Sequence, residues 1–167
     1  MAACTAKLAG AIVRIETLDL FYGGKGDSLF YHKWGRYLAP HYREGEINFY
    51  NAKFSGTPFI RRLVGWIYAG FGSNMVVGFL IFSYMSFIGL VFLWRAFKIA
   101  VPEGNVSRYT AMVLFYPSML YWPSSIGKEA WMLMVIGIGA WGVARLLMHA
   151  KVRGLIAIVA GIAEIGR

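Results

Sequence analysis

Long uncharged stretches alternate with short polar segments over the second half of the chain. No charged residue occurs from Leu63 to Trp94, a run longer than the roughly 20 residues that a transmembrane helix needs. Glycine, serine and asparagine interrupt this run at 70–74. The pattern therefore predicts an interfacial or re-entrant segment over 59–72, followed by a spanning helix over about 75–97.

Further helices are predicted beyond a polar loop at 101–108. A helix over about 109–122 contains Pro117, so we expect it to break near the membrane surface. The next predicted span covers 130–148, and residues 154–167 begin another helix that the chain does not complete. This pattern is typical of an all-α integral membrane protein, a polytopic helix bundle.

The first 58 residues differ from the rest, because they hold most of the acidic residues and no apolar run long enough to cross a membrane. Apolar residues at near-helical spacing predict a short amphipathic helix over 11–20. Aromatic residues among basic ones predict an interfacial helix over 28–42, and a glycine-rich turn at 21–27 separates the two. We expect residues 1–58 to form an exoplasmic loop with juxtamembrane helices, and residues 59–167 to form the transmembrane part.

The distribution of basic residues predicts the orientation. Two loops are rich in Lys and Arg, whereas the loop between them carries only Lys128. By the positive-inside rule, 95–108 and 149–153 are cytoplasmic and 123–129 lies outside. Residues 1–72 then lie outside as well, so Asp27 and the Lys128-Glu129 pair are expected to face the same compartment.

Composition supports a membrane protein. The chain is 58% hydrophobic with a mean hydropathy of +0.54, and 15% of its residues are charged, compared with about 25% in soluble domains. The net charge is +9, but the basic residues are dispersed around apolar segments. This favours anionic membrane lipid or a phosphate-bearing substrate as partner, rather than nucleic acid. The single cysteine, Cys4, excludes an intramolecular disulfide, and no zinc site is expected from the spacing of the three histidines.

One group of candidate site residues surrounds Asp27, within the stretch Gly24-Lys-Gly-Asp-Ser-Leu-Phe-Tyr-His32. If a helix starts here, Asp27 either caps it or presents a carboxylate that acts as a general base at the membrane surface. Tyr31 lies one turn further along. His32 is either an interfacial aromatic residue or part of a substrate site.

A second group surrounds Lys128-Glu129, which is framed by Trp122 and Ser125. The charged pair either anchors the start of a helix topologically or belongs to a site. In a site, Lys128 stabilises charge that develops on a leaving phosphate. Glu129 then positions a substrate hydroxyl or binds a metal, and Ser125 either caps the helix or hydrogen-bonds a phosphate.

These residues resemble the GT-C superfamily of integral-membrane glycosyltransferases. The resemblance rests on an aspartate followed by a tyrosine in the first exoplasmic loop, and on the stretch Pro117-Ser-x-x-x-Trp-x-Ser-Ser-x-x-Lys-Glu129 in the second. It covers about residues 20–155 and is nearest to the bacterial protein-mannosyltransferase and aminoarabinose-transferase branch. Members of that superfamily usually have eight or more spans and a helix before the aspartate. Neither is expected here, so the chain resembles a fragment, and the resemblance does not establish that this fragment is active on its own.

The resemblance implies an enzyme of the bacterial plasma membrane that moves a sugar from a polyprenyl-phosphate donor to a glycan or protein hydroxyl outside the cytoplasm. By position, Asp27 would accept the acceptor's proton. Glu129 would orient substrate, or bind a divalent ion if the reaction uses one; no other cofactor is implied.

The remaining implied roles concern the donor. Lys128, with Arg61 or Arg62, would neutralise the departing lipid phosphate, and Tyr31 and Trp122 would stack on the sugar or anchor the interface. Two alternatives stay open: a non-catalytic membrane protein or transporter of lipid-linked saccharides, and a polysaccharide polymerase or ligase of related fold.

Overall fold

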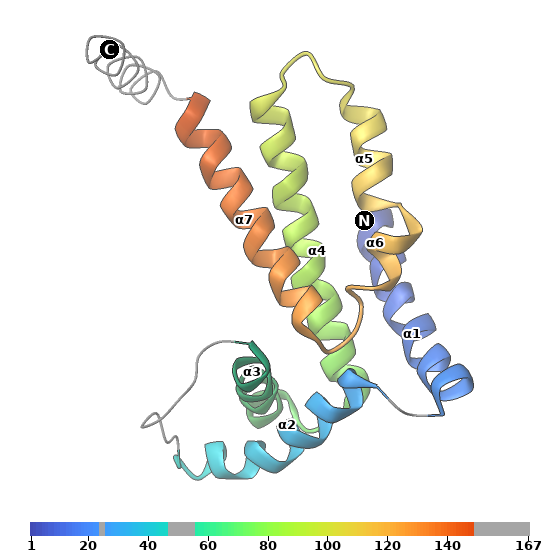
Figure 1. The fold of residues 1–167 in the computed structure, drawn as a ribbon, viewed down its shortest axis with the longest axis vertical. Coiled ribbons are helices and arrows are strands. Elements are labelled where there is room, and N and C mark those ends of the chain that lie inside the picture. The colour runs from blue at the N-terminus through green and yellow to red at the C-terminus, as the bar shows by residue number, and fades with distance from the viewer. Residues whose placement is uncertain (24–25, 47–55, 149–167) are drawn as a thin grey trace, which may run out of the picture.

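The computed structural model describes residues 1–23, 26–46 and 56–148, which form helices joined by short connections (Figure 1). The helices are α1 (Ala2–Tyr22), α2 (Asp27–Arg43), α3 (Gly56–Phe71), α4 (Met75–Ala100), α5 (Val106–Leu114), α6 (Pro117–Tyr121) and α7 (Lys128–Met148). No strand occurs among the described residues, so the predicted all-α class is confirmed for them. The helix predicted over 154–167 and the loop predicted over 149–153 lie outside the described residues.

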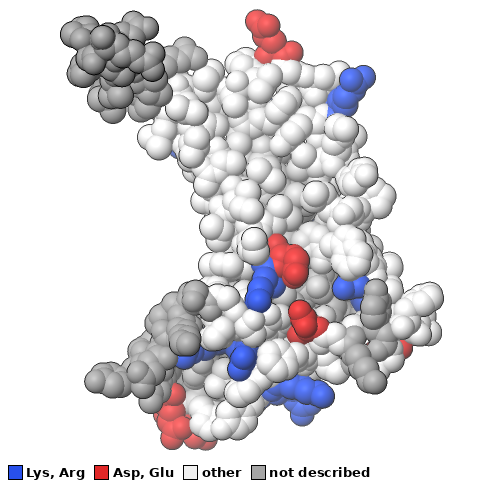
Figure 2. Space-filling view, in the orientation of Figure 1, with Lys and Arg blue, Asp and Glu red and all other residues white. Residues whose placement is uncertain are grey.

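Two of the described helices, α4 and α7, are long and apolar enough to cross a membrane. The side chain of Asn74 caps α4 by accepting a hydrogen bond of 2.8 Å from the backbone N–H of Val76. Figure 2 shows a band without charged side chains over the middle of the helices, with charges gathered toward the two ends. This is the surface expected of a protein whose central band faces lipid.

Helices α4 and α7 lie side by side because glycine replaces side chains where they cross (Figure 1). A Cβ atom built on Gly137 would overlap the backbone carbonyl of Gly89, and one built on Gly89 would overlap the carbonyl of Leu133. Further along, the rings of Phe92 and Trp141 meet edge to face at 5.2 Å. Such close approach of backbones is typical of helix pairs in membranes.

One part of the helical pattern differs from the prediction, and the break expected at Pro117 is confirmed. The short helix expected over 11–20 is the last half of α1, a 21-residue helix that precedes Asp27. Alanine, which favours helices, extends α1 toward the N-terminus. The charged residue Lys7 interrupts the apolar pattern of this extension in the sequence, but its side chain is buried in the fold. The helix expected over 109–122 is divided into α5 and α6, because Pro117 lacks the N–H that would continue α5 and instead begins α6.

Helices α2 and α3 pack on each other across the end of the molecule where α4 and α7 begin (Figure 1). Gly35 permits this contact, since a Cβ atom there would overlap the side chain of Val64. The pattern predicted a helix over 28–42 and an interfacial or re-entrant segment over 59–72; α2 contains Pro40 near its end.

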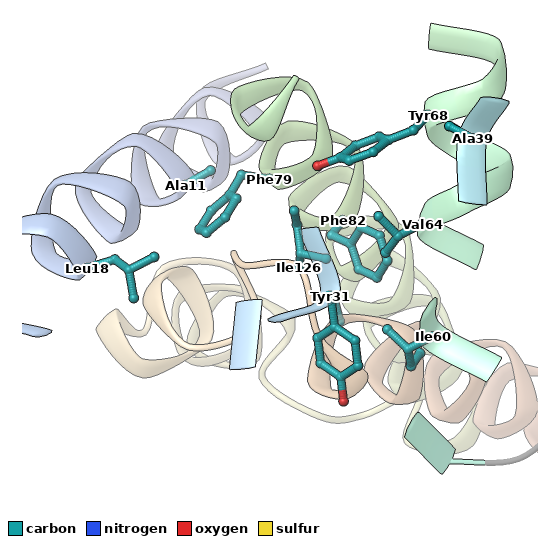
Figure 3. Close-up of a cluster of buried hydrophobic side chains, with 11 residues drawn as sticks. Ala11, Leu18, Tyr31, Ala39, Ile60, Val64, Tyr68, Phe79, Phe82 and Ile126 are labelled. Atoms are coloured by element: carbon teal, nitrogen blue, oxygen red, sulfur yellow. The ribbon is translucent and has the colours of Figure 1, made fainter. Parts of the chain in front are cut away.

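A hydrophobic core packs the helices together at this end of the molecule (Figure 3). Its buried side chains come from five helices and the loop before α7: Ala11, Leu18, Tyr31, Ala39, Ile60, Val64, Tyr68, Phe79, Phe82, Ile126 and Ala130. Because Ile126 belongs both to this core and to the loop that precedes α7, the core holds that loop against α1 and α4.

Candidate functional site

A pocket of about 260 Å³ lies where α1 ends, α2 begins and α7 begins. Its walls come from these three helices and from the loop between α6 and α7: Arg14, Leu18, Gly26, Asp27, Ser28, Trp122, Ser125, Ile126 and Glu129. Four of the residues singled out in the sequence, Asp27, Trp122, Ser125 and Glu129, therefore line one pocket, although about one hundred residues separate Asp27 from Glu129 along the chain. Two carboxylates and one guanidinium are its charged groups.

The two carboxylates reach the pocket from helix starts. Asp27 is the first residue of α2 and is exposed; Gly26 occupies the capping position, and no side-chain hydrogen bond caps this helix. The capping interpretation of Asp27 is therefore not supported, and its carboxylate is accessible to a substrate. The carboxylate of Glu129 folds over Gly127, where a Cβ atom would lie 2.6 Å from Glu129 Oε2. A glycine before α7 thus leaves room for the Glu129 side chain.

Arg14 is the cation of the pocket, and the sequence analysis did not identify it. Its Nη1 donates a hydrogen bond of 2.9 Å to the hydroxyl of Tyr121. The guanidinium also lies 4.8 Å from the ring centroid of Tyr121 and 4.9 Å from that of Trp122. The hydrogen bond and the two cation–π contacts fix the positively charged guanidinium of Arg14 at the pocket wall. No local pattern pointed to Arg14, because its partner Tyr121 lies 107 positions away in the sequence.

A buried polar network holds the loop that carries Trp122 and Ser125. The hydroxyl of Ser83 donates to the carbonyl oxygen of Lys7 at 3.0 Å and lies 3.2 Å from the hydroxyl of Ser124, which donates to the carbonyl of Leu120. The ammonium of Lys7 is buried and donates to the carbonyl oxygen of Met119. Buried polar groups that are paired in this way fix their surroundings, so α1, α4 and α6 position the loop jointly.

Tyr31 and His32 do not line the pocket; both are buried against α3. His32 Nδ1 lies 2.7 Å from the hydroxyl oxygen of Tyr68, and the two rings meet edge to face at 5.5 Å. Burial, and then the positive charge of Arg36, lower the pKa of His32 from its ordinary value. Burial likewise raises the pKa of Tyr68. A neutral histidine paired with a neutral tyrosine is a structural contact rather than a substrate site.

The three cations expected near a phosphate also lie elsewhere. Lys128 is half-buried at the start of α7 and is not among the residues that line the pocket. The guanidinium of Arg61 lies over the rings of Phe30 and Trp34, at 5.0 and 4.6 Å from their centroids. Arg62 lines a separate groove between α2 and α3.

The pocket does not offer a strong metal site. Asp27 and Glu129 are its only carboxylates, and the described residues contain no group of three or more His, Cys, Asp or Glu side chains that could hold an ion. What this arrangement can do is accept a proton at a carboxylate and hold an anion near Arg14.

Comparison with known proteins identifies no relative: no family model, no curated protein and no solved structure matches the chain.

Proposed function

We propose that the chain acts as a membrane glycosyltransferase of the GT-C type, which transfers a sugar from a polyprenyl-phosphate donor to an acceptor hydroxyl on the exoplasmic side of a bacterial plasma membrane. The observation that carries the proposal is the meeting of Asp27, Glu129 and Arg14 in one pocket at the end of two apolar helices. A lipid-linked donor fits that place, because its apolar tail needs the bilayer while its phosphate and sugar need a polar site at the surface.

In the proposed reaction the bond between the sugar and the donor phosphate breaks as the acceptor oxygen attacks the same sugar carbon. Asp27 accepts the proton that the acceptor hydroxyl loses. Polyprenyl phosphate leaves as an anion, and the fixed positive charge of Arg14 stabilises the charge that develops on it. This role passes from Lys128 to Arg14, because only Arg14 lines the pocket. Glu129 accepts hydrogen bonds from sugar or acceptor hydroxyls, with Trp122 as a ring against the sugar.

Transfer assays test the carboxylates. Membranes from cells that express the protein are incubated with a panel of radiolabelled polyprenyl-phosphate monosaccharides, and label is followed into glycan and protein. Asp27→Asn is expected to lower the rate by about 10²- to 10⁴-fold, the range for loss of a general base. Asp19→Asn is the matched control, since Asp19 is also exposed but lies outside the pocket. Full activity of Asp27→Asn at equal expression would refute the proposed role.

Donor binding is tested separately with a photoreactive polyprenyl phosphate. We expect Arg14→Gln to reduce crosslinking and Arg62→Gln to leave it unchanged, because Arg62 lines a different groove. Equal crosslinking of both variants would exclude Arg14 as the phosphate contact.

One observation favours transport of a lipid-linked saccharide as a second candidate function. Helix α5 stops before Pro117 and α6 begins there, and the ammonium of Lys7 is buried against a carbonyl of α6. Broken helices with buried ionisable groups are typical of transporters. Movement of a lipid-linked saccharide across vesicle membranes that Asp27→Asn leaves unchanged would favour this function. A polymerase or ligase would use the same pocket with a lipid-linked glycan as donor, and the transfer assay distinguishes it by the size of the product.

A further inference from the structure

The outer face of α2 exposes three aromatic rings in a row. Phe30, Trp34 and Tyr37 are 43%, 36% and 61% exposed. Phe30 and Trp34 meet edge to face at 6.4 Å, and Trp34 and Tyr37 at 5.9 Å. Rings at positions i, i+4 and i+7 share one face of a helix. Aromatic rings exposed together on one helix face are candidates for contact with a lipid or another partner.

Cations surround these rings. An open groove of about 350 Å³ is lined by Lys33, Trp34 and Tyr37, and Arg36 is exposed on the following turn. The guanidinium of Arg61, from α3, lies over the rings of Phe30 and Trp34. Its Nε is buried and has no hydrogen-bond partner in the described part of the chain.

Basic residues predominate in α2 and α3, although Asp27 begins α2 and Glu44 and Glu46 follow it. Ser28–Arg43 and Gly56–Phe71 contain no Asp or Glu, while they contain Lys33, Arg36, Arg43, Arg61 and Arg62. The partner that complements such a surface carries negative charge next to apolar groups.

The position of α2 in the fold favours a membrane lipid over other anionic partners. Its inner face, with Tyr31, Gly35 and Ala39, is buried against α3, so the aromatic face points away from the core. The helix lies across the end of the molecule where the spanning-type helix α4 begins (Figure 1). A helix in that position lies at the level of lipid headgroups, where aromatic rings and basic side chains are favoured.

We propose that the outer face of α2 is a docking site for an anionic phospholipid. The lipid phosphate binds Lys33 and Arg36, and the glycerol and upper acyl chains lie against Trp34 and Tyr37. This site is separate from the pocket that contains Asp27. Lipid binding at the outer face of α2 does not depend on which reaction that pocket performs.

Lipid binding to the purified full chain tests the proposal. The protein in detergent is titrated with phosphatidylglycerol or phosphatidylcholine, and bound lipid is counted by native mass spectrometry. We expect tighter binding of phosphatidylglycerol, and about 30-fold weaker binding of it by Lys33→Gln/Arg36→Gln, the effect of two basic groups near a headgroup. Arg95→Gln/Lys98→Gln is the matched control, because it removes the same charge at the other end of α4 and should keep the α2 affinity.

Each outcome decides the proposal. Unchanged phosphatidylglycerol binding by Lys33→Gln/Arg36→Gln would overturn it, and an equal loss in both double variants would show diffuse attraction to total charge instead. Trp34→Ala is expected to weaken binding while keeping the preference for phosphatidylglycerol, since the ring contacts apolar parts of the lipid. Displacement of bound lipid by water-soluble glycerol 3-phosphate would show that a free phosphate compound occupies the site, and would also overturn the proposal.

Discussion

Gly137 of α7 lies directly on the backbone of Gly89 in α4, with no side chain between them. A Cβ atom on Gly137 would overlap the carbonyl oxygen, carbonyl carbon and Cα of Gly89. These are backbone atoms, so the overlap is relieved only when the helices move apart. The separation of the two apolar helices therefore depends on this glycine pair.

Gly137→Ala is expected to destabilise the protein by about 1–3 kcal/mol, the usual cost of overpacking. The measurement is the free energy of unfolding in mixed detergent micelles titrated with dodecyl sulfate. Gly139→Ala is the control on the same helix, because a Cβ atom there meets nothing within 4 Å. It should cause no loss, and a gain of up to about 1 kcal/mol, because alanine favours the helix more than glycine does. Equal losses in the two variants would mean that lipid contact or another effect common to both positions, rather than the crossing, determines the result.

The pairing of His32 with Tyr68 predicts a loss of stability in acid. Because the pKa of His32 is lowered in the folded protein, the unfolded chain binds more protons below its ordinary pKa of about 6.5. Stability is therefore constant above that pH, falls as the pH decreases below it, and levels off once the folded protein is protonated too. Thermal unfolding at pH 5 and pH 7.5 measures the difference.

The variant His32→Gln should reduce that difference, since glutamine bonds the Tyr68 hydroxyl without titrating near neutral pH. His41→Gln is the control, because it removes a histidine from the same helix and leaves the His32 contact in place. If His32→Gln keeps the full acid sensitivity of the wild type, other groups cause it.

The sequence predicted the helices better than it predicted the site. Period and length were sufficient for α4 and α7, because a long uncharged run has few alternatives to a helix. Helix α1 was underestimated because Lys7 is polar in sequence but buried in the fold against a carbonyl of α6. A hydropathy pattern contains no information about such a partner.

The candidate site residues also differ in whether a local sequence feature or tertiary packing determines their environment. Asp27 and Glu129, which line the pocket, were singled out because each is a carboxylate near a glycine at an expected helix start, which is a local feature. Arg14 was missed, and His32 was included, because their environments depend on residues far away in sequence. Tyr121 lies 107 positions from Arg14, and Tyr68 lies 36 positions from His32. Local patterns identify a charged residue, but tertiary packing decides which pocket or core it enters.

Lys7 is expected to tolerate no reversal of charge. Its ammonium is buried and donates to the carbonyl oxygen of Met119, so Lys7→Glu would place an anion against a carbonyl dipole in a buried site. We expect a loss of at least about 3 kcal/mol, as for breaking a buried charged contact. Lys33→Glu serves as the control, because Lys33 is exposed on α2. Similar unfolding free energies for the two variants would show that the Lys7 contact contributes little.

The orientation of the pocket is tested by labelling single cysteines from outside intact cells. In a Cys4→Ser background, cysteine is placed at 27, 104 or 129, each in a separate variant. Positions 27 and 129 belong to the pocket, while position 104 lies in the loop between α4 and α5, at the other end of α4. We expect a membrane-impermeant maleimide to label 27 and 129 and to label 104 only after the cells are permeabilised. Labelling of 104 alone would place the pocket in the cytoplasm, where an exoplasmic transfer reaction cannot occur. Labelling of 27 in intact cells, with 129 labelled only after permeabilisation, would place the two positions on opposite sides of the membrane and contradict the shared pocket itself.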